Sequence, residues 1–185
     1  MRTFKIQVQV TADGFMGGPE GELDWMTWNW SDDQKEYVTA LHKNVDTMVL
    51  GRELAGTFIP AWESGPPGET QETVDLMVNT PKVVISNTLT ESPWNNATIA
   101  GGDPAATVND LKSREGGDII TYGGATLAQH LITEGLLDDI YLFVNPTAIG
   151  TGLPVFAPGV TTQLELVEAR GFDCGVTVLH YRPKR

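Results

Sequence analysis

Two adjacent glycines follow a predicted strand and precede a predicted helix. Gly123 and Gly124 stand between the strand predicted at 118–122 and residues 125–134, whose apolar side chains recur at helical spacing. Glycines let the backbone approach a ligand closely, and the start of a helix presents free N–H groups at the positive end of its dipole. This combination suits a pyrophosphate, although a turn that needs glycine only for its geometry has the same sequence.

Polar residues also follow two other predicted strands. Arg52 comes directly after a short apolar strand and its glycine, and Ser86, Asn87 and Thr88 end another strand. An arginine can grip a phosphate with two hydrogen bonds, and hydroxyl and amide groups can bind phosphate or ribose. The alternatives are a solvated arginine and an ordinary turn. Like the glycine pair, these residues stand outside the carboxyl ends of strands, where open α/β sheets bind ligands.

A glycine-rich segment at 13–21 comes before a carboxylate and an aromatic ring. Glycines flank Phe15 and Met16, and Asp24 and Trp25 follow shortly after. Such a segment suits a lid that closes over a flat ligand. The alternative is a surface turn followed by a core tryptophan.

Other chemistries find little support in the sequence. The three histidines, His42, His130 and His180, lack metal-ligand spacing, so we expect no metal site. The single cysteine, Cys174, excludes an intramolecular disulfide. A G-x-S-x-G nucleophile motif is absent, which leaves Ser64 and Cys174 as weak candidates for a hydrolase. The G-x-G-x-x-G and G-x-x-x-x-G-K phosphate motifs are absent as well.

Composition excludes further classes of protein. The 185 residues include 24 acidic and 12 basic side chains, a net charge of −12, which opposes binding to nucleic acids and to anionic membranes. Hydrophobic residues make up 41%, so we expect a folded chain with a real core. No apolar run approaches the roughly 20 residues that span a bilayer, and the first residues lack the apolar region of a signal peptide. These features predict one domain over 1–185 in a cytoplasmic protein.

Strands and helices alternate along the chain. Period-two and apolar patterns predict strands at 3–11, 47–50, 82–86, 95–102, 118–122 and 140–144, with an antiparallel hairpin within 163–182. Helical spacing predicts helices at 32–44, 70–78, from 103 to the stop at 116–117, and 125–134. A capping box of Ser31 and Gln34 starts the first helix, and the prolines within 59–69 predict a loop. This order predicts an α/β fold with a largely parallel sheet and an antiparallel C-terminal edge.

The motifs taken together resemble a known family. They read T-A-D-G-F at 11–15, G-E-L-D-W at 21–25, D-T-M-V-L-G-R at 46–52, K-V-V-I-S-N-T-L at 82–89, Y-G-G-A-T-L at 122–127, G-L-L-D-D at 135–139 and G-T-G-L-P-V-F at 150–156. Their order and spacing resemble the dihydrofolate-reductase-like superfamily, in particular stand-alone relatives of the riboflavin-biosynthesis reductase (RibD C-terminal) domain. The resemblance spans residues 4–182.

The resemblance implies a three-layer α/β/α fold that binds NADPH and transfers hydride to a small heterocycle or to a carbonyl or imine. The residues that would hold the cofactor are Gly123, Gly124, Ala125, Thr126 and Leu127 at the pyrophosphate, Gly51, Arg52, Ser86, Asn87 and Thr88 at the adenosine 2′-phosphate, and Ala12, Asp13 and Trp25 at the nicotinamide. Asp24 and Tyr122 would face the substrate as the catalytic residues. Relatives pair through their C-terminal strands, which implies a homodimer.

The sequence departs from the family pattern at two positions. Tyr122 stands where riboflavin-pathway reductases carry a substrate-binding glutamate, and Asn87 stands where relatives often have an arginine. The substrate therefore stays open. The alternative to a reductase is a non-catalytic module of the same fold that binds a nucleotide or another small molecule.

Overall fold

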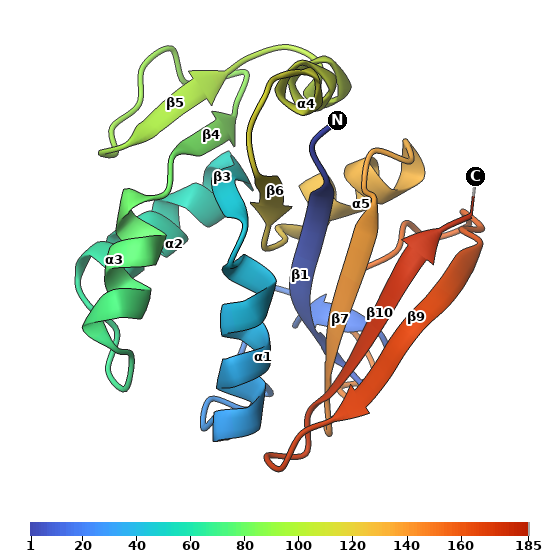
Figure 1. Ribbon diagram of the computed structural model, residues 1–185. Coiled ribbons are helices and arrows are strands. Elements are labelled where there is room, and N and C mark those ends of the chain that lie inside the picture. The colour runs from blue at the N-terminus through green and yellow to red at the C-terminus, as the bar shows by residue number, and fades with distance from the viewer. Residues whose placement is uncertain (185) are drawn as a thin grey trace.

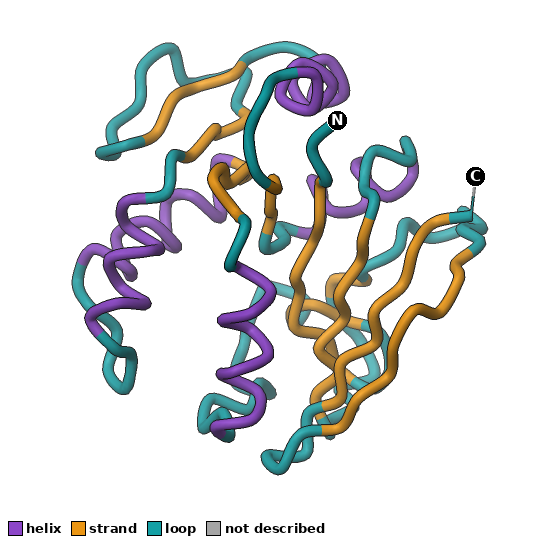
Figure 2. Tube along the Cα trace, viewed as in Figure 1, coloured by secondary structure: helices purple, strands orange, loops and turns teal. Residues whose placement is uncertain are grey.

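One eight-stranded sheet runs through the protein in the computed structural model, which describes residues 1–184 (Figure 1). Its strands lie in the order β5-β4-β3-β6-β1-β7-β10-β9. Their bounds are β1 Phe4–Thr11, β3 Val45–Gly51, β4 Lys82–Ile85, β5 Ala97–Ala100, β6 Asp118–Thr121, β7 Asp139–Asn145, β9 Leu164–Gly171 and β10 Thr177–Pro183. The helices are α1 Asp32–His42, α2 Arg52–Glu63, α3 Gln71–Asn79, α4 Pro104–Ser113 and α5 Ala125–Thr133. Figure 2 shows these helices in purple and the strands in orange.

The sheet is parallel from β5 to β7 and antiparallel from β7 to β9. The predicted α/β class, with a mostly parallel sheet and an antiparallel C-terminal edge, is confirmed. Strand β6 lies between β3 and β1, so a strand from late in the chain completes the centre of the sheet.

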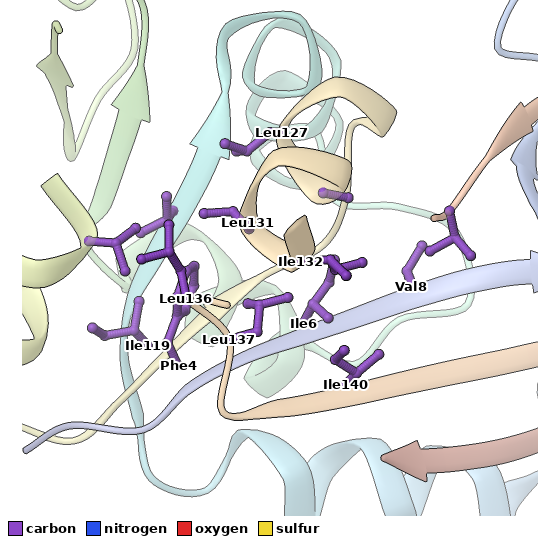
Figure 3. Packing of buried hydrophobic residues seen from close by; sticks show 14 of the residues in the cluster. Phe4, Ile6, Val8, Ile119, Leu127, Leu131, Ile132, Leu136, Leu137 and Ile140 are labelled. Carbon is purple, nitrogen blue, oxygen red and sulfur yellow. The ribbon is translucent and has the colours of Figure 1, made fainter. Parts of the chain in front are cut away.

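Helices cover both faces of the sheet, as the three-layer prediction required. Alternate residues of β1, including Phe4, Ile6 and Val8, pack against α4 and α5 on one face. Figure 3 shows Leu131 and Ile132 of α5 beside Ile6. Helices α1, α2 and α3 pack on the opposite face through separate apolar clusters.

The prediction of a capping box at the start of α1 is wrong, because its hydrogen bonds do not form. Ser31 is the N-cap residue, but its side chain makes no capping bond to the helix. Its Oγ instead accepts from the backbone N–H of Cys174, 3.2 Å away, and the thiol of Cys174 donates to Oε1 of Gln34 at 2.9 Å. Ser31 and Gln34 therefore bind the turn between β9 and β10 instead of capping the helix.

The loop predicted at 59–69 is wrong over its first five residues. These belong to α2, which carries Pro60 in its interior. A proline there removes one intrahelical hydrogen bond and lowers helix stability. Ala55 and Ile59 are buried against Leu50 and Val84, and this tertiary packing outweighs the local preference.

A second, two-stranded sheet ties two distant loops together. Strand β2, Phe15–Gly17, lies in the glycine-rich segment and pairs with β8, Leu153–Pro154. The N–H of Ala12 donates to the carbonyl of Thr147 at 2.8 Å. The loop after β1 is therefore fixed to the loop after β7.

None of the helices formed by residues 1–184 is long and apolar enough to cross a membrane.

Candidate functional site

The four predicted cofactor segments converge at one edge of the sheet, the edge formed by the carboxyl ends of four neighbouring strands. They follow β4, β3, β6 and β1, which are consecutive neighbours in the sheet and run parallel. Gly51 pairs with Ile85, so Arg52 and Ser86 leave the sheet side by side. The structure thus brings together segments that are up to 110 residues apart in the sequence.

Two helices begin at this edge without a side-chain cap. Gly51 is the N-cap of α2 and Gly124 is the N-cap of α5. The two helix starts touch: a Cβ on Gly51 would lie 3.8 Å from Cβ of Leu127, and a Cβ on Gly124 would lie 3.8 Å from Cβ of Leu54. The positive ends of two helix dipoles therefore lie close to one another.

The first N–H groups of α5 remain available to a ligand. The first backbone bond into the helix is from Ala128 N–H to the carbonyl of Gly124, at 2.9 Å. Within residues 1–184, nothing accepts from the N–H groups of Ala125, Thr126 or Leu127. These are the donors that an anion at a helix start uses.

Gly123 connects the pyrophosphate turn to the segment that we predicted as a lid. It has a φ of 114°, and a Cβ at this position would lie 2.7 Å from Cε of Met16 in β2. The positive φ favours glycine here, and the end of the flexible Met16 side chain packs against its backbone. The predicted lid thus lies directly against the predicted pyrophosphate turn.

Arg52 is exposed at the first position of α2. Its guanidinium lies 3.4 Å from the Glu53 carboxylate, a solvent-exposed pair of small energetic value. It also lines a groove of about 460 Å³ that extends along α2 to Leu89 and Trp94. The side chain can therefore reorient toward a ligand at the edge.

The polar run after β4 is partly occupied by its own turn. The buried Ser86 Oγ accepts from the N–H groups of Thr88 and Leu89 at 3.2 and 3.1 Å. Oδ1 of Asn87 accepts from the N–H of Gly102 at 2.6 Å, which holds the loop between β5 and α4. Thr88 and the Asn87 amide nitrogen face solvent at the edge.

Asp13 holds a loop in place. Its carboxylate accepts from the N–H of Gly150 at 2.7 Å and from that of Ile149 at 3.2 Å. Hydrogen bonds from the Thr11 side chain and from these two amides hold the pKa of Asp13 below its usual value. The exposed Ala12 lies beside it at the end of β1.

Two adjacent residues at the end of the predicted lid differ in exposure. The Trp25 ring is buried, and its Nε1 donates to the carbonyl of Glu22 at 2.9 Å. Asp24 is exposed, and no residue of the described chain hydrogen-bonds to its carboxylate. Tyr122 lies on the face covered by α1, where its ring packs against His42 and Phe58.

The Tyr122 hydroxyl makes a buried hydrogen bond to α1. It lies 2.7 Å from Nε2 of His42, and the Tyr122 ring stacks on those of His42 and Phe58. Nδ1 of His42 lies 2.7 Å from the Val38 carbonyl, which only accepts, so Nδ1 carries the proton and Nε2 accepts from Tyr122. Burial lowers the pKa of His42 and raises that of Tyr122, which keeps both groups neutral.

The residues at the edge fit a dinucleotide phosphate. The glycine turn provides a cradle, two uncapped helix starts provide donors, and Arg52 provides a cation in a protein of net charge −12. When bound, NADPH would supply the hydride. None of the residues described, 1–184, forms a cluster able to hold a metal ion.

Sequence reasoning missed one residue that organises this edge. Asn145, fully buried at the end of β7, accepts from the N–H of Thr27 through Oδ1 at 2.8 Å and donates from Nδ2 to Gln9 Oε1 at 2.9 Å. It thereby connects the segment just after the predicted lid to β1. The sequence shows Asn145 only as the polar end of an apolar strand followed by a proline.

Comparison with known proteins agrees with this architecture. Residues 2–178 match the family described as the RibD C-terminal domain. The uncharacterized protein YyaP of Bacillus subtilis (strain 168) is 33% identical over 184 residues, which cover 97% of this chain and 94% of that protein.

Solved structures share the fold. A putative riboflavin biosynthesis protein from Shewanella sp. PV-4 superimposes with a TM-score of 0.74 at 21% identity, covering 100% of both chains. Dihydrofolate reductase from Enterococcus faecalis superimposes with a TM-score of 0.61 at 15% identity, covering 99% of this chain and 97% of that one. With a family match over nearly its whole length, this chain belongs to the RibD C-terminal domain family and has the dihydrofolate-reductase-like fold.

Proposed function

We propose that the protein is an NADPH-dependent reductase that transfers hydride to a small heterocyclic, carbonyl or imine substrate. The observation that carries this proposal is the contact between the glycine-capped starts of α2 and α5, at Gly51 and Leu127. Hydride transfer needs a cofactor held against its acceptor with water excluded, and no protein nucleophile. The solved structure of the Enterococcus faecalis reductase holds NADP(H) on this fold, which supports the choice of cofactor.

The proposed roles follow the geometry of the edge. Gly123, Gly124 and the N–H groups of residues 125–127 bind the pyrophosphate. Arg52, with Gly51, Ser86, Asn87 and Thr88 around it, binds the 2′-phosphate. Ala12, Asp13 and Trp25 line the nicotinamide side, Asp13 by holding the turn after β1 in place. Asp24 delivers the proton from solvent, and Tyr122 faces the substrate.

A titration of the purified protein with NADPH and NADH tests the cofactor. Energy transfer from tryptophan to the nicotinamide reports binding. Arg52→Gln should weaken NADPH binding by about tenfold to hundredfold, the loss expected when a charge-assisted hydrogen bond of roughly 1.5–3 kcal/mol is removed. It should leave NADH binding nearly unchanged.

The matched control for this titration is Arg114→Gln. Arg114 is also exposed and also pairs with one carboxylate, that of Asp110, but it lies at the end of α4. Equal loss of NADPH and NADH in Arg52→Gln would refute its role, and absence of binding by either nucleotide would refute the reductase.

A non-catalytic binding module is the second candidate. The observation in its favour is that neither predicted proton donor is both positioned and free: Asp24 is exposed to solvent, and the Tyr122 hydroxyl donates to His42. NADPH binding without oxidation of the cofactor across a panel of heterocyclic and carbonyl acceptors would favour this module over the enzyme.

We also propose a homodimer formed through the C-terminal strands. Strand β9 is at the edge of the sheet, and its Leu166 and Val167 are 55% and 46% exposed. An exposed apolar edge strand invites pairing with another strand. Light scattering after gel filtration should give twice the mass of 20.1 kDa, and Val167→Lys should give the monomer mass.

A further inference from the structure

Three glutamine side chains leave buried amide atoms without a partner. Among residues 1–184 these atoms are Oε1 of Gln7, Nε2 of Gln9 and Nε2 of Gln34. Buried polar atoms nearly always have a hydrogen-bond partner, so such a group needs an explanation. All three lie in one region of the molecule.

Gln7 and Gln9 lie on the face of β1 that α1 covers. Residues two apart on a strand share a face, and Nζ of Lys5, on the same face, donates to the carbonyl of Leu41 in α1 at 3.1 Å. Gln34 belongs to α1 itself and is fully buried. The unpartnered amide atoms therefore come from β1 and from the helix that lies over it.

Neighbouring hydrogen bonds fix the orientation of the Gln9 amide. The backbone N–H of Thr27 only donates, so Oδ1 of Asn145 accepts and Nδ2 of Asn145 donates. Nδ2 in turn donates to Oε1 of Gln9, and to the carbonyl of Phe143 at 3.1 Å. The atom left without a partner is therefore the amide nitrogen of Gln9, which carries two hydrogens.

This donor lies near the carboxyl end of β1, the end that the proposed nicotinamide residues Ala12 and Asp13 follow. Gln9 precedes Ala12 by three residues on β1, and Asn145 pairs with Thr11 across the sheet. Thr27 lies just after the predicted lid, two residues beyond Trp25. Two hydrogen bonds, from Thr27 to Asn145 and from Asn145 to Gln9, therefore couple the segment after the lid to the orientation of the Gln9 amide.

We propose that Gln9 determines substrate specificity: its Nε2 donates to a carbonyl oxygen on the ring that receives the hydride. This inference rests on the proposed reductase function. Gln7 offers a carbonyl oxygen on the same face for an N–H group of that ring. A ring with an amino group in place of the carbonyl would bring N–H against N–H, and a buried donor left unpaired by the wrong ligand discriminates strongly.

Two pteridines that differ at one substituent test this assignment. Pterin carries an oxo group at position 4, and 2,4-diaminopteridine carries an amino group there. Calorimetry on NADPH-saturated wild-type protein should show pterin binding at least tenfold more tightly. Gln9→Glu keeps the oxygen that accepts from Asn145 but replaces the donor by an acceptor, so the preference should reverse.

Two further variants control the experiment. Gln9→Met removes the donor without adding a charge, and it should bring the two affinities within about twofold. Nδ2 of Asn145 loses Oε1 of Gln9 in this variant but keeps the carbonyl of Phe143 as an acceptor. Gln71→Glu, on the exposed face of α3, should keep the wild-type preference. If the buried charge of Gln9→Glu prevents folding, Gln9→Met alone still tests whether the Gln9 donor sets the preference between the two rings.

The outcomes separate this inference from the proposed function. A wild-type protein that prefers the amino ring or binds neither ring overturns the assignment, and so does an unchanged preference in Gln9→Met. Failure of NADPH to bind would instead defeat the reductase proposal, and the preference between the two rings would still be measured on the protein without cofactor.

Discussion

The hydroxyl of Tyr122 donates its hydrogen bond to Nε2 of His42 across the interface between β6 and α1, at 2.7 Å. The other ring nitrogen of His42 donates to Val38 within the same helix. The bond therefore fixes the tautomer of a buried histidine and fixes the Tyr122 ring immediately before the glycine turn. Both consequences can be measured.

Stability should decrease as the pH falls below about 6.5, the pKa of an unperturbed histidine. Burial, together with the charge of Lys5, lowers the pKa of His42 in the folded protein. The unfolded chain therefore takes up this proton first, and acid favours unfolding with a slope of at most about 1.4 kcal/mol per pH unit. Urea denaturation between pH 5 and 8 measures the slope, and His42→Asn should reduce it. A slope equal to wild type in that variant would contradict the assignment.

Tyr122→Phe should lower the free energy of unfolding by about 1–2 kcal/mol, because it leaves the buried Nε2 of His42 without a donor. Tyr181→Phe is the matched control, since the Tyr181 hydroxyl bonds to nothing within residues 1–184. Turnover tests the predicted catalytic role separately. A fall in kcat of at least tenfold at unchanged NADPH affinity would support it.

Asp24→Asn should lower kcat by about a hundredfold or more, the usual contribution of a positioned acid or base. Its exposure and its lack of partners predict that stability and NADPH affinity stay at wild-type values. Asp32→Asn, at the start of α1, serves as a control for the loss of one acidic charge. Unchanged turnover in Asp24→Asn would leave water as the proton source.

Gly124→Ala should destabilise the protein by about 1–2 kcal/mol, because Gly124 has a φ of 84° that side chains disfavour. It should also weaken NADPH binding by displacing the start of α5. Gly51→Ala is the matched substitution at the other helix start. Gly51 has a φ of −75°, and an added Cβ would make an ordinary contact with Leu127, so stability should change little. Denaturation curves that coincide for the two variants would argue against this difference.

Asp13→Ala should accelerate hydrogen exchange at the amides of Ile149 and Gly150, which lose their acceptor. Asp24→Ala removes a neighbouring carboxylate that holds no amide, and exchange at both positions should remain slow. Mass spectrometry of peptides from residues 146–153 makes the comparison.

Local signals made much of the fold predictable. Period-two alternation identified β1, Asp103 and Pro104 marked the start of α4, and the two glycines marked the start of α5. Burial of Ile59 decides that Pro60 lies in a helix, and burial is a tertiary property. Strand β2 escaped prediction because its partner β8 lies more than 130 residues later.

The site residues divide in the same way. Glycines at strand ends meet local backbone requirements, so the positions where these strands end could be predicted from the sequence. The direction of a polar side chain is set by partners far along the chain. The amides of residues 149–150 donate to Asp13, and Asn145 donates to Gln9. Sequence reasoning could therefore single out Asp13 as a candidate but could not show that it holds a loop.

The central position of β1 determines when the chain can fold during synthesis. Both neighbours of β1, β6 and β7, are completed only at residues 121 and 145. A nascent chain therefore keeps an apolar strand with two open edges until most of the protein has left the ribosome. Contacts of such long sequence separation slow folding and expose the strand to aggregation. We expect chains that stop before β7 to remain unfolded and to depend on chaperones.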